Sequence, residues 1–239
     1  MNRFLFLAAG IVMTMTSCHY VNGKHVSGNG TIASEQRSIT GFTGVETHGS
    51  IDIITSQGAY NVKVEADQNL LQYIETTIEN GRLKVRFRRG ISISDSKGAR
   101  VYVTAPELNA FETHGSGNIS GQGKISDKNK MGVEISGSGD IQLTLDCPEI
   151  KTETHGSGNI TLSGETRNLF SRISGSGDVD AGNLKAETVK VSIHGSGDTQ
   201  VFASESLDVE VSGSGDVHYS GAPKITTSIH GSGSVRKVN

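Results

Sequence analysis

The stretch VKVSIHGSGDTQV, residues 189–201, decides the fold of this chain. With the exception of Thr199, the residues at one parity are apolar or glycine: Val189, Val191, Ile193, Gly195, Gly197 and Val201. The opposite parity is polar and includes Ser192, His194, Ser196 and Asp198. A period of two is typical of a β-strand with one face in a core and the other in solvent. The stretch therefore predicts an extended segment whose glycines lie on the core side, where opposing walls approach closely or the strand bends at a corner.

The Gly-Ser-Gly-Asx word inside this stretch is repeated along the chain. Copies begin at Gly115, Gly137, Gly156, Gly175, Gly195 and Gly213, with related words at Gly49 and Gly231, and successive copies from Gly115 lie 18 to 22 residues apart. A unit of that length cannot bury its apolar side alone, whereas parallel units stacked at about 4.8 Å can. The repeat predicts an all-β protein, a parallel β-helix or β-solenoid, with no helix longer than about two turns.

The residue before the first glycine alternates between histidine and serine over seven copies: His114, Ser136, His155, Ser174, His194, Ser212 and His230. Either a coil of about 38 residues has histidines on one wall and serines on the other, or a coil of about 19 residues has rungs that alternate. We favour the larger coil, because identical residues tend to stack in solenoids. In that coil only the histidine wall would gain charge below about pH 6.5.

The N-terminus of the 239-residue chain has the pattern of a targeting segment. A basic residue precedes an apolar run of ten residues, which is too short to cross a membrane. The word Met15-Thr16-Ser17-Cys18 then resembles the lipobox of bacterial lipoproteins, in which the cysteine is lipidated. We expect a signal peptide at 1–17, lipidation at Cys18 and a short tether at 18–27. The other cysteine, Cys147, is interpreted as a small core residue.

The remaining residues, 28–239, are expected to form a single solenoid domain. Residues 28–105 form irregular N-terminal coils or a cap, and residues 106–239 form the regular repeats. Within the cap, the apolar positions of 74–78 and 83–87 flank Asn80-Gly81, which predicts a hairpin. Its outward parity carries a basic stripe, which we interpret as a solvated strand face: Arg82, Lys84, Arg86, Arg88 and Arg89.

Several separate words resemble the family described as "putative auto-transporter adhesin, head GIN domain", which is common among lipoproteins of Bacteroidetes-type bacteria. They are Gly41-Phe42 with Val45, Ala66-Asp67-Gln68-Asn69-Leu70-Leu71, Asn80-Gly81-Arg82-Leu83, Thr104-Ala105-Pro106-Glu107-Leu108, and the Gly-Ser-Gly-Asn-Ile copies at 115–119 and 156–160. The resemblance covers roughly residues 28 to 235 and implies a right-handed parallel β-helix. The family name implies adhesion only by analogy.

Two outward rows are the candidate surface-binding residues. One row is His114, His155, His194 and His230, with His48 at the equivalent earlier position, and the other is Asp140, Asp178, Asp198 and Asp216. Imidazoles in a row suit metal binding or pH sensing. No Cys, Asp or Glu falls at a fixed offset from the histidine in every coil, so we interpret them as polar surface decoration. The acids follow glycine without the spacer of calcium-binding repeats, so we expect turn-stabilising bonds. The sequence predicts no metal site and no cofactor.

Composition and spacing favour a non-enzymatic function. The acids are spread one per repeat instead of converging, and no catalytic residues are predicted. The net charge of −3 does not favour nucleic acid. We expect a lipid-anchored protein of the cell envelope and outer membrane, an adhesin or binding module for a glycan or protein ligand. A purely structural or signalling periplasmic lipoprotein is the alternative, and a β-helix polysaccharide lyase or hydrolase is a distant third. Whether the protein faces the surface or the periplasm stays open.

Overall fold

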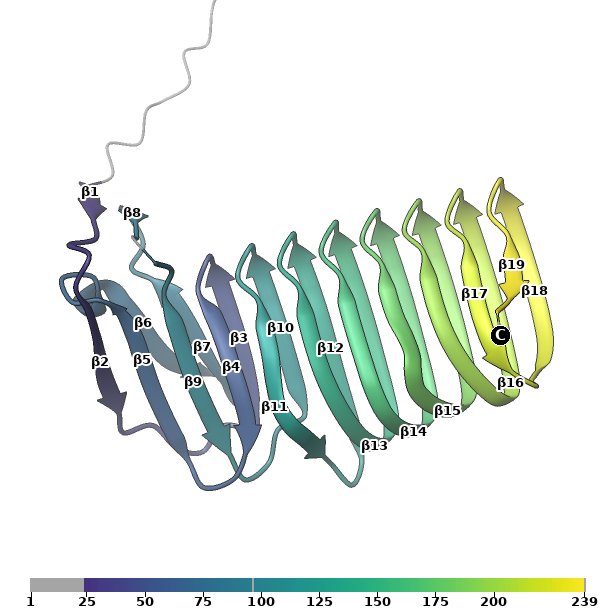
Figure 1. The fold of residues 1–239 in the computed structure, drawn as a ribbon, viewed down its shortest axis with the longest axis horizontal. Coiled ribbons are helices and arrows are strands. Elements are labelled where there is room, and N and C mark those ends of the chain that lie inside the picture. Colours follow the sequence, from purple (N-terminus) through teal and green to yellow (C-terminus); the bar gives the residue numbers. More distant parts are fainter. Residues whose placement is uncertain (1–23, 96, 239) are drawn as a thin grey trace, which may run out of the picture.

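The computed structural model describes residues 24–95 and 97–238, which form an elongated stack of β-coils (Figure 1). The N-terminal third comprises β1 (Lys24–Ser27), β2 (Ile32–Arg37), β3 (Gly44–Gly49), β4 (Asp52–Gln57), β5 (Asn61–Asp67), the 3-10 turn η1 (Leu71–Tyr73), β6 (Ile74–Glu79), β7 (Arg82–Phe87), β8 (Ile91–Ser94) and β9 (Arg100–Ala105). The regular part comprises β10 (Ala110–Gly115), β11 (Ile119–Ser126), β12 (Lys130–Gly137), β13 (Ile141–Gly156), β14 (Ile160–Gly175), β15 (Val179–Gly195), β16 (Thr199–Gly213), β17 (Val217–Gly221), β18 (Lys224–Gly231) and β19 (Val235–Lys237).

The strands form two walls. We call wall A the face formed by the strands that end at the first glycine of a word, which are β3, β10, β12, the second halves of β13 to β16, and β18, together with β7, which pairs with β3. Wall B is the face formed by the strands that follow, which are β4, β11, the first halves of β13 to β16, β17 and β19, together with β9, which pairs with β4. Pairing between successive coils is parallel throughout the regular part, so the predicted parallel β-solenoid is confirmed.

One coil is about 19 residues long, and the expectation of a larger coil with a histidine wall and a serine wall is wrong. Ile141 pairs with Ile160, which lies 19 residues later, and His155 pairs with Ser136 on one side and Ser174 on the other. Histidine and serine therefore alternate along a single wall. Alternation places most imidazoles two rungs apart, which removes the steric and charge crowding of direct cross-strand neighbours. Because no wall carries histidines alone, the pH effect expected for a separate histidine wall does not apply.

The Gly-Ser-Gly-Asx word forms a corner between two strands, which confirms the bend that the sequence offered as one of two explanations of its glycines. In the representative copy, β13 ends at Gly156, Ser157 to Asn159 make the bend, and β14 begins at Ile160. Gly156 has a φ of +133°, a conformation that favours glycine. Gly158 is buried, and a Cβ there would lie 3.0 Å from the carbonyl carbon of Gly139 in the preceding coil and closer still to its oxygen. The glycines are required because successive coils stack closely at the corner, and not because the two walls approach each other.

The core is a thin apolar layer between the walls. Its columns repeat from coil to coil, for example Ile119, Ile141, Ile160 and Val179 from wall B, and Ile173, Ile193 and Val211 from wall A, all buried; the buried Thr154 precedes Ile173 in the second column. The period-two alternation shifts by one residue at the corner opposite the glycines, where buried Cys147 and Ile150 enclose Pro148 and Glu149. Cys147 is 2% exposed and its thiol donates to the Glu149 carbonyl, as expected of a core cysteine.

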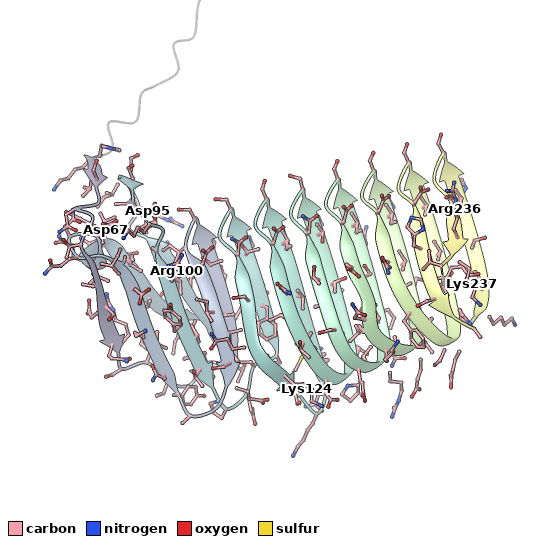
Figure 2. The ribbon with its side chains drawn as sticks, in the orientation of Figure 1. Asp67, Asp95, Arg100, Lys124, Arg236 and Lys237 are labelled. Carbon is pink, nitrogen blue, oxygen red and sulfur yellow. The ribbon has the colours of Figure 1, made fainter. Side chains whose placement is uncertain are left out.

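The N-terminal end of the stack is closed by antiparallel strands. β2 pairs antiparallel with β5, and β5 with β9. The predicted hairpin is confirmed as β6 and β7, with Asn80 and Gly81 both at positive φ in the turn. Asp67, at the end of β5, is buried and accepts the Gly30 N–H at 2.7 Å (Figure 2). The last four residues of the expected tether, 24–27, form β1 and pair with β8.

Candidate functional site: the outward rows of the solenoid

A continuous ladder of hydrogen bonds joins the Asp and Asn side chains of the glycine corners. In each coil the side-chain Oδ1 accepts the backbone N–H of the equivalent residue in the next coil. The donors and acceptors are Asn118 to Asp52 at 2.9 Å, Asp140 to Asn118 at 2.9 Å, Asn159 to Asp140 at 2.8 Å, Asp178 to Asn159 at 3.0 Å, Asp198 to Asp178 at 2.7 Å, Asp216 to Asp198 at 2.7 Å, and Ser234 to Asp216 at 2.7 Å.

This ladder assigns a structural task to the aspartate row. The side-chain-to-backbone bonds expected from the sequence are present, but they connect successive coils and do not close local turns. The Asn159 Nδ2 also donates to Asp140 Oδ1 at 3.1 Å. At this position the row therefore places an N–H donor, and not a second negative charge, beside the carboxylate. At the C-terminal end, Asp216 accepts a second bond from the Ser234 hydroxyl at 2.8 Å. Both bonds from Ser234 lower the pKa of Asp216.

The histidine row lies on the outer face of wall A, as the period-two pattern of apolar and polar residues predicts. His155, His194 and His230 are exposed, whereas His48 and His114 are half-buried. Ser136, Ser174 and Ser212 occupy the intervening rungs. The row is therefore a straight line of hydrogen-bonding side chains along the axis of the solenoid.

A second row, of glutamates, runs beside the histidines and was missed in the sequence. Glu46, Glu112, Glu134 and Glu153 are successive partners across β3, β10, β12 and β13. The signal that could have found them is the word Glu-Thr-His-Gly-Ser, which occurs at 46–50, 112–116 and 153–157. Strand geometry brings residues i and i+2 to the same face, so each of these words presents a carboxylate beside an imidazole.

His48 and His114 break the histidine–serine alternation. They are direct partners of β3 and β10, and their rings stack with centroids 4.7 Å apart and planes inclined by 25°. His48 Nε2 is in close contact with Glu46 Oε1, and His114 Nε2 lies 3.9 Å from Glu46 Oε1 and 3.9 Å from Glu112 Oε2. The side chains of Glu46 and Glu112 are only 12% and 13% exposed. We call these four residues the 46/48/112/114 cluster.

The two carboxylates of the cluster differ electrostatically. Burial acts to raise the pKa of Glu46, but hydrogen bonds with His48 and Lys84 outweigh it, and the pKa is lowered. Burial raises the pKa of Glu112, with a smaller contribution from the neighbouring carboxylates of the row, although Arg82 opposes the change. Burial, with the neighbouring acids of the row, thus holds the pKa of Glu112 above that of an isolated glutamate.

The basic stripe of β7 is largely neutralised by acids. Arg82 Nη2 lies 2.7 Å from Glu112 Oε1, Lys84 Nζ lies 3.2 Å from Glu46 Oε1, and Arg86 Nε lies 3.1 Å from an oxygen of Glu75. These pairs span β7, the hairpin strand β6 and the first coils. The basic stripe therefore connects the cap to the solenoid through ion pairs. It is not only a solvated strand face.

Wall B carries a polar hollow of about 350 Å³ in the middle of the solenoid. It is lined in part by Ser120, Gln142, Thr161, Ser163 and Asn183. The pairing of β14 with β15 shifts register between Thr161 and Ser163, which opens the sheet locally. On the edge near this wall, Lys124 extends from the end of the coil opposite the glycine corners, 2.9 Å from Asp146 (Figure 2).

The predicted signal peptide and Cys18 lie outside the described residues. Within the described part of the chain, no helix has the length and hydropathy needed to cross a bilayer.

Comparisons with known proteins agree with the solenoid. No protein with a curated description matches the chain. A crystal structure of a "putative adhesin" from Bacteroides fragilis superposes with a TM-score of 0.82 at 22% identity, covering 89% of this chain and 100% of that one, and shows the fold alone. A "putative lipid binding protein" from Parabacteroides distasonis gives 0.74 at 27% identity, covering 90% and 100%. A "putative adhesin" from the same species gives 0.69 at 25% identity, again covering 90% and 100%.

The family suggested by the separate sequence words is the one that these comparisons identify. The model of that family matches residues 41–223, which include most of the cap, the glycine corners as far as Gly213 and the 46/48/112/114 cluster. The chain belongs to the family described as "putative auto-transporter adhesin, head GIN domain".

Proposed function

We propose that this protein is a non-enzymatic, lipid-anchored protein of the cell envelope that acts as an adhesin or binding module. Its binding surface is the outer face of wall A, and its ligand is a glycan or a protein surface. The family and the adhesins among its structural relatives support a role at the cell envelope.

The observation that carries the proposal is the regularity of the outward rows. Imidazole and hydroxyl groups alternate from rung to rung in register across wall A, and His155, His194 and His230 are exposed. A rigid sheet holds these groups at fixed spacing, so a repetitive ligand can make the same hydrogen bond in several coils without ordering a loop. Avidity along the row compensates for weak individual contacts.

The acids that a β-helix lyase or hydrolase would need have another task here. The aspartates of the corners hold the backbone of the next coil through Oδ1, and successive members lie on separate rungs. General acid–base catalysis needs groups that converge on one substrate atom. Their arrangement favours a binding or structural module over an enzyme.

A binding screen tests the role. The chain from His19 onward is applied to glycan, envelope-protein and host-protein arrays. Any ligand is then tested against a wall A variant, R172A/H194A, and a matched wall B variant, Q142A/Q200A. Arg172 is the exposed partner of Glu153 on wall A, and Gln200 is exposed on wall B. We expect the wall A variant to lose binding and the wall B variant to retain it. Loss in the wall B variant alone would move the site to the other face, and no ligand at all would favour a purely structural or signalling lipoprotein.

Anchoring at Cys18 is tested separately. Cells that express the chain are fed a fatty-acid analogue, and the protein is isolated and examined for the label. We expect Cys18→Ala to abolish labelling and to leave an uncleaved or soluble product. Cys147→Ala is the matched control, because Cys147 is buried in the core. Equal labelling of Cys18→Ala and the unchanged chain would overturn the lipoprotein assignment.

A further inference from the structure

The row of histidines is interrupted at one place among the described rungs. From Gly115 onward every histidine of the row has serine as its neighbour in the adjacent coil, as His155 has Ser136 and Ser174. His48 and His114, by contrast, are direct partners with stacked rings. A position where a strict repeat is broken is where a specific site can exist on a solenoid.

The glutamate row completes this position. Each of the two histidines has a carboxylate two residues before it on the same face, Glu46 and Glu112. One ligand atom each from Glu46, His48 and His114 lie within 4.8 Å of one another, and Glu112 Oε2 is 3.9 Å from His114 Nε2. Two ligands bound at about 2.0–2.1 Å to a tetrahedral zinc ion lie about 3.4 Å apart. The longest separation among the three atoms, up to 4.8 Å, must therefore shorten by at most about 1.4 Å for all three to coordinate one ion.

We propose that Glu46, His48 and His114 form a binding site for a divalent first-row transition metal, with zinc as the representative ion and Glu112 as a further ligand. Two imidazoles with carboxylate oxygen suit zinc and its neighbours, whereas calcium and magnesium prefer all-oxygen sites. The site does not depend on the proposed adhesin role, because the cluster is defined by its own geometry.

The surroundings of the cluster are compatible with a cation. Lys84 and Arg82 contact the carboxylates, but each carboxylate has about four lone-pair positions and keeps room for a metal. Lys84 and Arg82 face three acids of the row, Glu46, Glu112 and Glu134, and Arg86, the partner of His48 in β7, is paired with Glu75. Lys84 is itself held by Glu79 at 3.1 Å, which fixes its position as an outer partner of the site.

The cluster is also open to solvent on one side. His48 lines a hollow of about 300 Å³ together with Arg86, Phe87, Arg89 and Ile91. A metal bound by two histidines and one or two carboxylates at this edge would have space for water or an external donor group. The side chains of Glu46 and Glu112 are less exposed than the two imidazoles, so the open side of the cluster is the histidine side.

Zinc and cobalt titrations of the full chain test the site. Isothermal calorimetry with Zn²⁺ measures stoichiometry and affinity, and the visible absorption of added Co²⁺ reports histidine and carboxylate coordination directly. The variants H48S and H114S introduce the serine that the row already has at Ser136 and Ser174, so the fold tolerates it. H155S is the matched control, because His155 also has a glutamate two residues before it but no histidine neighbour.

We expect one Zn²⁺ per chain, at least about tenfold weaker binding in H48S and in H114S, and a change of less than about twofold in H155S. The Co²⁺ bands should be lost in H48S and H114S and unchanged in H155S. Circular dichroism of each variant checks the fold. Zinc binding weaker than a Kd on the order of 100 µM in the unchanged chain, binding that survives both cluster variants, or an equal loss in H155S would overturn the proposal.

Discussion

Alanine at Gly158 should destabilise the solenoid strongly, although the change adds a single methyl group. Gly158 is the second glycine of its corner, and its backbone is not in the left-handed region, so the variant tests steric stacking separately from backbone strain. The added Cβ would lie 3.0 Å from the Gly139 carbonyl carbon and 3.0 Å from Ile135 Cγ2. Carbon atoms pack best at about 3.5–4.0 Å, so the two coils must separate by at least about 0.5 Å.

Separation at this corner weakens bonds that connect the coils. The Gly158 N–H donates to the Gly137 carbonyl at 3.2 Å, and the Asn159 N–H donates to Asp140 Oδ1 at 2.8 Å. Two weakened hydrogen bonds at about 1 kcal/mol each, with overpacking of about 1–3 kcal/mol, give an expected loss of about 3 kcal/mol in the free energy of unfolding.

The matched control is Gly132→Ala. Gly132 lies in β12 on the outer face of wall A, and a Cβ there meets no atom within 4 Å. This variant should be neutral or slightly stabilising, because alanine restricts the unfolded chain. Urea denaturation followed by circular dichroism compares the two. A difference between G158A and G132A of less than about 1 kcal/mol would refute the stacking explanation for the glycine words.

Three further predictions concern the Asp/Asn ladder of the glycine corners and the core cysteine. Asp198→Asn keeps the Oδ1 that accepts the Asp216 N–H and removes one of three successive negative charges, so the urea midpoint should stay or rise, whereas Asp198→Ala should cost about 1 kcal/mol. Because the pKa of Asp216 is lowered in the folded chain, its carboxylate stabilises the fold above the unfolded-state pKa, and this contribution is lost as pH falls through the folded value. Ser234→Ala should raise that folded pKa in a carboxyl NMR titration, and an unchanged value would contradict the assigned cause. Burial raises the pKa of the Cys147 thiol, so a thiol reagent should react slowly with the folded chain and rapidly in denaturant, and rapid reaction in both would contradict its burial.

The strand pattern, the parallel stacking and the cap hairpin could all be predicted from the sequence, whereas the coil length could not, and the corner at the glycines was only one of two alternatives that the period-two pattern left open. Alternation continues without a shift across the corner, because the second glycine, Gly158, is buried at the same parity as Ile160. Nothing in the period-two pattern therefore marks where the wall ends. The shift occurs at the other corner, between Cys147 and Ile150, where the sequence shows only ordinary turn residues.

The 46/48/112/114 cluster was missed for a different reason. His48 and His114 are separated by 66 positions in the sequence, because most strands of the cap lie between β3 and β10 in the chain. Only the pairing of β3 with β10 in the structure shows that the two histidines are neighbours. For the histidines, the expectation that identical residues stack is correct at this one pair and wrong for the later coils, where serine separates them. Pairing register, which single-sequence patterns do not encode, decides between the two cases.

The repetition of one interface from coil to coil also makes the length of the protein adjustable. Removing residues 160–178 would join Asn159 to Val179 and restore the same corner, the same side-chain-to-backbone bond and the same apolar column. Whole coils can thus be duplicated or lost in evolution without new contacts having to arise. Each such event also changes the order of the outward row: this deletion would place His155 directly beside His194, so a change in the number of coils can by itself create a new pair of neighbouring imidazoles.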